Sequence, residues 1–377
     1  MSNEKSKSSW MAAYSVASVW FGTHVGVGFA TGNQAIQYYV QYGWIACFLP
    51  LLSMGILAIV MNEIMKFAKT RNLNSYKEVF AEMWAPYSKL EITMEIFYVI
   101  IILAAVGGAI ATAASILESF GISYTIATFI VGAIIVALSI FGVNLILKAS
   151  AILSIIILIV SFIMYFAGIF EKSGEINQIF ATQQASNIGA AIWNSILYNG
   201  FQNVSIPAML AVAMTLNVKG IKRANILGWL MNGLALVVSS LMLLLWYNEI
   251  SAQGSLALPN LYVCQKMGYS WLYICYSVAL FCAVISTDIT LVYTMVTKYE
   301  NAKIFNKIKN NNFKRIIIAL IVIIFCMAIS FFGLSNLVKY GYGFCGYIGL
   351  VFITIPVLTI VRKKNKKYIK EHPESVE

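Results

Sequence analysis

The segment FGTHVGVGFATG, residues 21–32, lies inside an apolar run from Met11 to Val40 and carries four glycines and one of the chain's two histidines. A glycine in a helix interior costs about 1 kcal/mol relative to alanine. Backbone that leaves the helix at membrane depth is tolerated only where it is buried in protein or lines a polar cavity. An apolar helix interrupted in this way predicts a binding site near the middle of a membrane.

The composition of the chain is that of an integral membrane protein. Of its 377 residues, 60% are hydrophobic and 11% are charged, whereas soluble domains carry about 25% charged residues. Apolar runs long enough to span a bilayer recur along the whole sequence. We therefore expect one transmembrane domain over residues 1–377 with short polar tails. The first apolar run is too long for a signal-peptide core, and we interpret it as a retained helix.

Neither nucleic acid nor a bound metal cluster is predicted as a partner. The net charge is +11, but the basic residues lie in short loops between apolar runs, as the positive-inside rule requires. The six cysteines show no CxxC or Cys/His ligand spacing, so no disulfide framework is indicated either. Two histidines and one aspartate are too few for an intramembrane enzyme, so we expect none.

The apolar runs predict ten all-α transmembrane helices. Their approximate limits are residues 11–40, 43–66, 90–118, 122–142, 147–170, 187–216, 221–248, 268–298, 315–333 and 341–361. With both termini in the cytoplasm, 23 of the 26 lysines and arginines lie inside, and only Lys172, Lys266 and Lys339 lie outside. Adding or removing one helix would destroy this alternation. We therefore expect a multi-pass protein of the cell membrane with cytoplasmic termini.

Ten helices divide into two halves of five, residues 11–170 and 187–361. Because five is odd, the second half starts from the opposite side of the membrane, as an inverted repeat requires. The sixth span contains Asn199-Gly200, which is a turn signal, and Pro207, which removes a helical hydrogen bond. We therefore predict that helices one and six are both broken. The alternative is that glycine and proline here only permit close helix packing.

The ends of a broken helix expose amides on one side and carbonyls on the other. Amides around residues 26–31 are predicted to attract a carboxylate, and carbonyls around residues 22–25 a cation. The sixth span adds neutral polar and aromatic groups, namely Tyr198, Asn199, Phe201, Gln202 and Asn203. A zwitterionic amino acid matches this set. His24 has three open roles: a substrate ligand, a carrier of a coupling proton, or a structural hydrogen-bond donor. Gly107 and Gly108 leave room beside the site or serve helix packing.

Helix eight carries a polar stripe and a carboxylate. Ala283, Ser286 and Thr287 share a face, and their oxygens suit a small hard cation such as sodium. Equally, the two hydroxyls can bond back to a carbonyl one turn earlier. Asp288 lies on another face, and pairing with Lys148 or direct ion ligation are alternatives for it. Asp288, Lys148 and Asn203 are our candidate coupling or gating residues, while Glu63 is expected to reach the membrane interface.

Taken together, these residues resemble the LeuT fold of the amino acid–polyamine–organocation superfamily and its sodium-symporter relatives. Residues 21–34 more narrowly resemble the opening of the uncharacterised YkvI-type membrane protein family. The resemblance implies a sodium site formed by Gly22, Val25, Ala283, Ser286 and Thr287. It implies a substrate site at the residues His24, Gly26, Val27, Gly28, Phe29, Tyr198, Asn199, Gly200, Phe201 and Gln202. Phe29 stands where symporters of this fold place an asparagine for another sodium ion, so that site is expected to be absent.

The leading interpretation is a secondary active transporter of a small zwitterionic solute, coupled to sodium and working by alternating access. No other cofactor is expected, and the expected partners are a small-molecule substrate and membrane lipid. One alternative is a ligand sensor of the same fold without net transport. Another is a proton-coupled transporter that uses His24 or Asp288. Some proton-coupled relatives of this fold place a lysine from helix five in the sodium site, but residues 151–160 contain no basic residue, which favours sodium. The sequence does not indicate protein partners.

Overall fold

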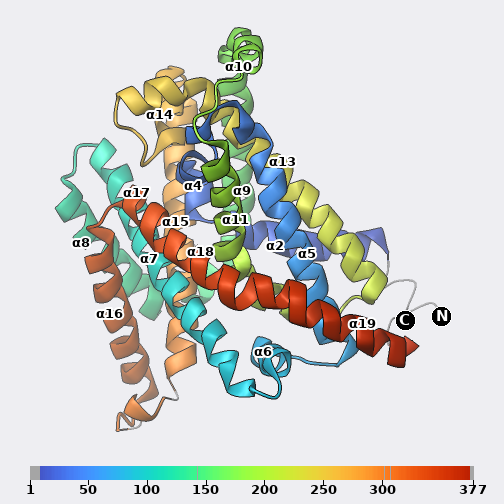
Figure 1. Cartoon of the computed structure of the whole chain (residues 1–377). Coiled ribbons are helices and arrows are strands. Elements are labelled where there is room, and N and C mark those ends of the chain that lie inside the picture. The colour runs from blue at the N-terminus through green and yellow to red at the C-terminus, as the bar shows by residue number, and fades with distance from the viewer. Residues whose placement is uncertain (1–8, 142, 301, 306, 374–377) are drawn as a thin grey trace.

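The computed structural model describes the backbone of residues 9–141, 143–300, 302–305 and 307–373, and their side chains except those of 140–151 and 154. Within these ranges all regular structure is helical (Figure 1). The α-helices are α2 (Trp10–His24), α3 (Val27–Thr31), α4 (Asn33–Tyr38), α5 (Leu49–Thr70), α6 (Tyr76–Trp84), α7 (Ile92–Ser119), α8 (Tyr124–Phe141), α9 (Val143–Glu171), α10 (Ile176–Thr182), α11 (Ile188–Gln202), α12 (Ile206–Ala213), α13 (Val218–Ala252), α14 (Pro259–Lys266), α15 (Ser270–Tyr299), α16 (Asn311–Ser330), α17 (Leu334–Asn336), α18 (Gly343–Gly349) and α19 (Arg362–Glu371).

Several of these helices are long and apolar enough to cross a membrane, which makes the chain a multi-span membrane protein. Among the described residues they are Leu49–Thr70, Ser88–Ser119, Val218–Ala252, Ser270–Tyr299, Asn311–Ser330 and Leu334–Glu371. A seventh span results if the pair Ile155–Glu171 and Ser173–Thr182, bent by 63°, is counted as one. The other three predicted spans fall on interrupted or shorter helices: α2 to α4, α8, and α11 with α12. The count of ten spans stays a prediction.

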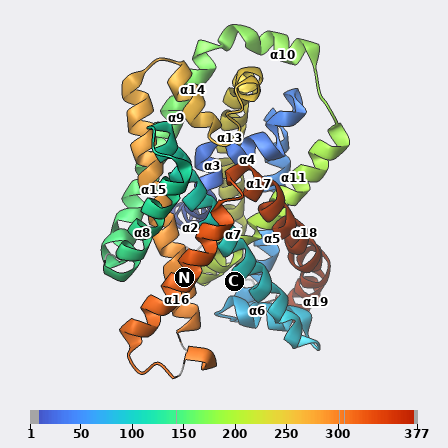
Figure 2. The same ribbon diagram turned by 90° about the vertical axis from the view of Figure 1, so that its left-hand side faces the viewer.

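The long helices pack in two groups. In one group α13 packs against α2 and α5, and α11 and α12 also contact α5. In the other, α15 packs against α7, α9 and α16, and α7 contacts α8. The first predicted span connects them, because α2 lies on α12 and α13 while α3 contacts α7, α14 and α15. Its interruption therefore lies where the chain passes from one group to the other. At one end of the molecule α10 runs between α9 and α11 (Figure 2).

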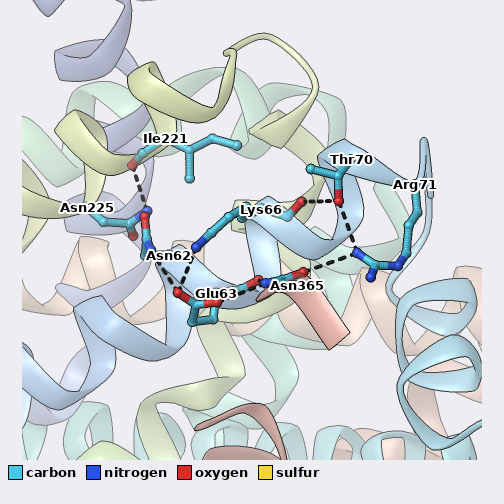
Figure 3. A network of polar contacts seen from close by, with 8 residues as sticks. All are labelled: Asn62, Glu63, Lys66, Thr70, Arg71, Ile221, Asn225 and Asn365. Atoms are coloured by element: carbon cyan, nitrogen blue, oxygen red, sulfur yellow. Dashed lines mark hydrogen bonds and ion pairs between the residues drawn. The ribbon is translucent and has the colours of Figure 1, made fainter. Parts of the chain in front are cut away.

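The last span is longer than predicted. Its helix runs from α17 through stretches of π-helix and α18 into α19 (Figure 1), so the basic segment after residue 361 is helical. Asn365 of α19 is 1% exposed, and its amide donates to both the backbone oxygen and Oε2 of Glu63 on α5, each at 2.9 Å (Figure 3). Glu63 also pairs with Lys66 at 2.8 Å. Glu63 is thus buried within the protein, where these partners compensate its charge.

Candidate functional site

The first predicted span is interrupted directly after His24. Val25 and Gly26 are non-helical, and Gly26 is extended with φ −95° and ψ −173°. The Gly26 amide donates to the carbonyl of His24 at 2.7 Å instead of continuing the helical pattern to Gly22. Within the described backbone, the carbonyls of Gly22 and Val25 therefore accept no backbone hydrogen bond. No side chain caps α3, so its first amides also lack an acceptor from a preceding turn.

A second interruption follows at Gly32. This glycine has φ +81° and separates α3 from α4. The side-chain amide of Asn260 donates to the carbonyl of Ala30 at 2.9 Å, and the hydroxyl of Tyr276 donates to the same oxygen. A Cβ atom at Gly32 would lie 2.5 Å from Oδ1 of Asn260. The end of α3 is thus held by two residues more than 220 positions later, Asn260 and Tyr276, and these residues were not among the sequence candidates.

A buried tyrosine joins the two predicted broken spans. Nε2 of His24 and the hydroxyl of Tyr198 on α11 are 2.8 Å apart, and both side chains are at most 2% exposed. The Tyr198 hydroxyl donates to Oε1 of Gln34 at 3.3 Å and accepts from Nε2 of Gln202 at 3.3 Å. Because a tyrosine has one proton to donate, His24 donates from Nε2 in this arrangement. Nδ1 of His24 is then an acceptor; it forms no close hydrogen bond, although the side chain of Asn232 lies beside the imidazole.

Aromatic rings close one side of this cluster. The rings of Tyr38 and Phe201 lie 5.3 Å and 4.8 Å from that of Tyr198, and Phe201 stacks on Tyr342 at 5.3 Å. Tyr38 also lines a hollow of about 520 Å³ on the far side, together with Gln37, Gln41, Asn194 and Lys339. Phe29, predicted as a substrate residue, lies 5.5 Å from the ring of His24. The aromatic layer thus separates His24 from this outer hollow.

The other side of the interruption is open. Gly22 and Thr23 are exposed although they precede the buried His24. A Cβ atom built on Gly22 or Gly26 would meet no described atom within 4 Å. The positions that side chains would take at these two glycines are therefore unfilled.

The second predicted break differs from the first. Asn199 and Gly200 are helical in α11, and the change comes at Asn203, where a 3₁₀ turn (Asn203–Ser205) leads into α12 with right-handed dihedrals throughout. Gly200 instead permits a close helix crossing, because a Cβ atom there would lie 2.2 Å from the carbonyl oxygen of Gly346 in α18. The break predicted at Asn199-Gly200 is thus a milder transition three residues later.

Polar side chains around this transition bind the last span. Thr354 donates to Oδ1 of Asn199 at 3.0 Å and accepts from Nδ2 of Asn203 at 2.9 Å. Nδ2 of Asn199 and Oδ1 of Asn203 are buried without a described partner. These two asparagines therefore tie α11 to the end of the chain and keep one free donor and one free acceptor.

The predicted sodium residues lie on separate elements, with Gly22 in α2, Val25 in the interruption and the other three residues in α15. α15 packs against α3, so Ser286 and Thr287 belong to the helix that lies beside the interruption. Both hydroxyls donate to the carbonyl oxygen of Ala283 at 2.9 Å. This is the back-bonded arrangement that the sequence left open. Each hydroxyl thereby uses its one proton as a donor and keeps its lone pairs free for an ion. The Ala283 oxygen, in contrast, already accepts two side-chain hydrogen bonds within helix α15.

Asp288 has no compensating partner among the described side chains. It is 0% exposed, and neither carboxylate oxygen forms a hydrogen bond. The predicted pairing with Lys148 concerns a side chain that lies outside the described residues. Gly107 serves packing, since a Cβ atom there would lie 2.6 Å from Ile329 of α16, whereas a Cβ atom on Gly108 would make only ordinary contacts, at 3.6 Å and 3.7 Å.

Sequence reasoning missed two polar residues at the interruption. The side chain of Gln34 folds over Gly28, where an added Cβ atom would lie 2.3 Å from its Nε2 atom. Asn232 of α13 lies beside His24, is 0% exposed, and has an Oδ1 atom without a described partner. Both are amides inside apolar runs, and that position is the signal that could have identified them.

Solved structures with the same fold are transporters. A Na⁺-coupled sialic acid symporter matches with a TM-score of 0.61 and 13% identity, over 92% of this chain and 89% of that one. MhsT in complex with L-phenylalanine matches with a TM-score of 0.57 and 12% identity, over 96% and 98% of the two chains. The manganese transporter of Eremococcus coleocola matches with 0.56 and 17% identity, over 92% and 78%. The chain therefore has the LeuT fold, as the sequence predicted.

Sequence comparison agrees over a shorter stretch. The chain is 37% identical over 76 residues to the uncharacterised membrane protein YkvI of Bacillus subtilis (strain 168). This match spans about a fifth of each protein, 20% of this chain and 21% of YkvI. No protein-family profile matches the chain. The expected similarity to a YkvI-type protein is thus confirmed for this stretch.

Proposed function

We propose that this protein is a secondary active transporter of a small zwitterionic solute, an amino acid or a related compound. The observation that carries the proposal is the interruption beside His24, which has exposed residues on one side and an aromatic layer on the other. Exposed Gly22 and Thr23 lead to it from one side, and the Tyr38–Tyr198–Phe201 layer closes it from the other. A site that opens to one side at a time is what alternating access requires.

The groups at the interruption match a zwitterion. In this proposal the free amides of α3 bind a carboxylate and Nδ1 of His24 accepts from an ammonium group. Nδ2 of Asn199, whose Oδ1 atom is bound to Thr354 of the last span, is assigned as a further donor. We assign the remaining site to Gly26, Val27, Gly28, Phe29, Gly200, Phe201 and Gln202. In this proposal Gly200 shapes the helix crossing and Gln202 orients Tyr198.

We propose sodium as the coupling ion, bound between the carbonyls of Gly22 and Val25 and the lone pairs of Ser286 and Thr287. The Ala283 carbonyl would join only after it gives up a hydroxyl donor. The Na⁺-coupled symporter of the same fold supports this assignment. Coupling by protons through His24 or Asp288 is the alternative that the unpartnered Asp288 favours.

In the same proposal the chain forms one domain of ten spans, with repeats over residues 11–170 and 187–361. Both termini lie in the cytoplasm, and the exposed Gly22 side of the interruption faces the cell interior. Cysteine variants placed at Thr23 and Lys339 test this orientation with a membrane-impermeant thiol reagent in whole cells. We expect the reagent to label the Lys339→Cys variant and not the Thr23→Cys variant. Labelling of Thr23→Cys alone would show that the orientation is the reverse of the proposed one.

Uptake into proteoliposomes tests the function. We expect accumulation of at least one labelled amino acid under an inward sodium gradient, with little accumulation under an equal potassium gradient. Binding without accumulation would instead support a sensor. The double variant Ser286→Ala/Thr287→Ala should lose the sodium dependence, whereas Thr290→Ala, which removes an equally back-bonded hydroxyl one turn later, should keep it.

A further inference from the structure

The outer faces of α5 and α13 form a groove away from the proposed transport site. Its hollow of about 400 Å³ is lined by Gly55, Ala58, Ile59, Asn62, Lys222, Asn225, Ile226 and Trp229. On each helix these residues follow the spacing i, i+3, i+4, i+7, which places them on one face. The hollow exists because α5 contributes a glycine and an alanine at two of its four positions.

Most of the groove is apolar and accessible. Ile59 is 51% exposed and Ile226 is 40% exposed on its two walls. The indole nitrogen of Trp229 donates to the carbonyl of Leu51 at 3.0 Å, so this ring is held in place beside the groove. A Cβ atom on Gly55 would lie 3.5 Å from this nitrogen. A larger side chain at residue 55 would therefore fill the space over the indole.

One end of the groove is polar. Asn62 follows Gly55 by seven residues, about 10 Å along the helix, and Lys222 and Asn225 reach the same end from α13. Lys222 is exposed and forms no ion pair within the described part of the chain. Oδ1 of Asn225 is buried and has no described partner. The groove thus combines an apolar length with one cationic end.

We propose that this groove binds an anionic phospholipid, with its phosphate at Lys222 and one acyl chain along Ile59, Ile226 and Trp229. A soluble anion would gain nothing from the apolar walls, and a lipid without net charge would gain less from the lysine. Asn62 provides a second donor for the phosphate. Its amide also contacts Oε1 of Glu63 at 3.4 Å, in the cluster that holds Asn365 of α19 (Figure 3). A bound headgroup therefore lies beside the contacts that attach the C-terminal helix.

Thermal stability of the full-length protein in detergent tests this binding. Dioctanoyl phosphatidylglycerol should raise the melting temperature more than dioctanoyl phosphatidylcholine does, and inorganic phosphate should have no effect. The Lys222→Gln variant should weaken the apparent affinity for phosphatidylglycerol about five-fold, because a lysine near an anionic headgroup contributes about 1 kcal/mol. Lys363→Gln removes an equal charge from the exposed face of α19 and should leave the affinity unchanged.

Filling the groove tests its location. Gly55→Leu should abolish the stabilisation by phosphatidylglycerol, and Ala58→Leu should do the same if the first variant does not fold. Equal stabilisation by both lipids, an equal loss in Lys363→Gln, or a shift reproduced by phosphate alone would overturn the proposal. Full stabilisation of a folded groove-filling variant would overturn it as well. None of these results depends on transport, so the proposed function is tested separately.

Discussion

Gly26 and Gly28 look equivalent in the sequence, but the structure predicts that alanine destabilises the protein at Gly28 and is nearly neutral at Gly26. A Cβ atom on Gly26 meets no described atom within 4 Å, whereas on Gly28 it would lie 2.3 to 2.5 Å from three atoms of the Gln34 side chain. Gln34 would have to leave its place. Its hydrogen bond from Tyr198, at 3.3 Å, would then be lost.

The expected cost can be worked out from these contacts. Overpacking costs about 1–3 kcal/mol, and the lost hydrogen bond about 1 kcal/mol. Alanine in α3 recovers about 1 kcal/mol of helix propensity, so Gly28→Ala should lose about 1–3 kcal/mol. Unfolding entropy over 377 residues is about 0.8 kcal/mol/K, so the melting temperature should fall by about 1–4 °C. Gly26→Ala should stay within about 0.5 kcal/mol of the unsubstituted protein.

Intrinsic-fluorescence melting of the purified variants measures these shifts. The double variant Gly28→Ala/Gln34→Ala completes a double-mutant cycle, in which the steric cost should vanish. Equal destabilisation by Gly26→Ala and Gly28→Ala would refute the reasoning. The reasoning would also be refuted if the destabilisation of the double variant equalled the sum of the destabilisations of the two single variants.

Three further predictions concern the site and the C-terminal helix. Tyr198→Phe should destabilise the fold by about 1–3 kcal/mol, because it leaves the buried polar side chains around the hydroxyl unpaired; the melting temperature reports this. Ser286→Ala should weaken the apparent sodium affinity of uptake about ten-fold or more, since oxygen contacts to a charged group contribute about 1.5–3 kcal/mol; unchanged sodium titration curves would contradict it. Asn365→Leu should lower stability by about 2–3 kcal/mol through the loss of two buried hydrogen bonds, while Lys366→Gln on the exposed face of α19 should be neutral, with melting curves of both variants as the check.

Much of the fold follows from local features of the sequence. The length of the apolar runs predicts the spanning helices. The cluster of glycines at residues 22–32 predicts an interruption, and the structure has it at Val25 and Gly26. The turn signal at Asn199-Gly200 misled us about the second break, because α11 remains helical where Gly200 packs against Gly346. A local sequence signal such as Asn-Gly permits several backbone conformations. Packing against a neighbouring helix then determines which of them the folded protein adopts.

The sequence by itself determined the class of protein, the site of the first interruption and the polar residues inside apolar runs, because membrane solvation acts on each segment separately. Only the tertiary structure decided what these residues contact. The bond between His24 and Tyr198 joins residues 174 positions apart, and the burial of Glu63 depends on Asn365 from the far end of the chain. Such contacts depend on the packing of distant helices, and no local pattern specifies them. For the same reason only the folded chain brought the stripe from Gly55 to Asn62 against that from Lys222 to Trp229 and formed a groove with one cationic end.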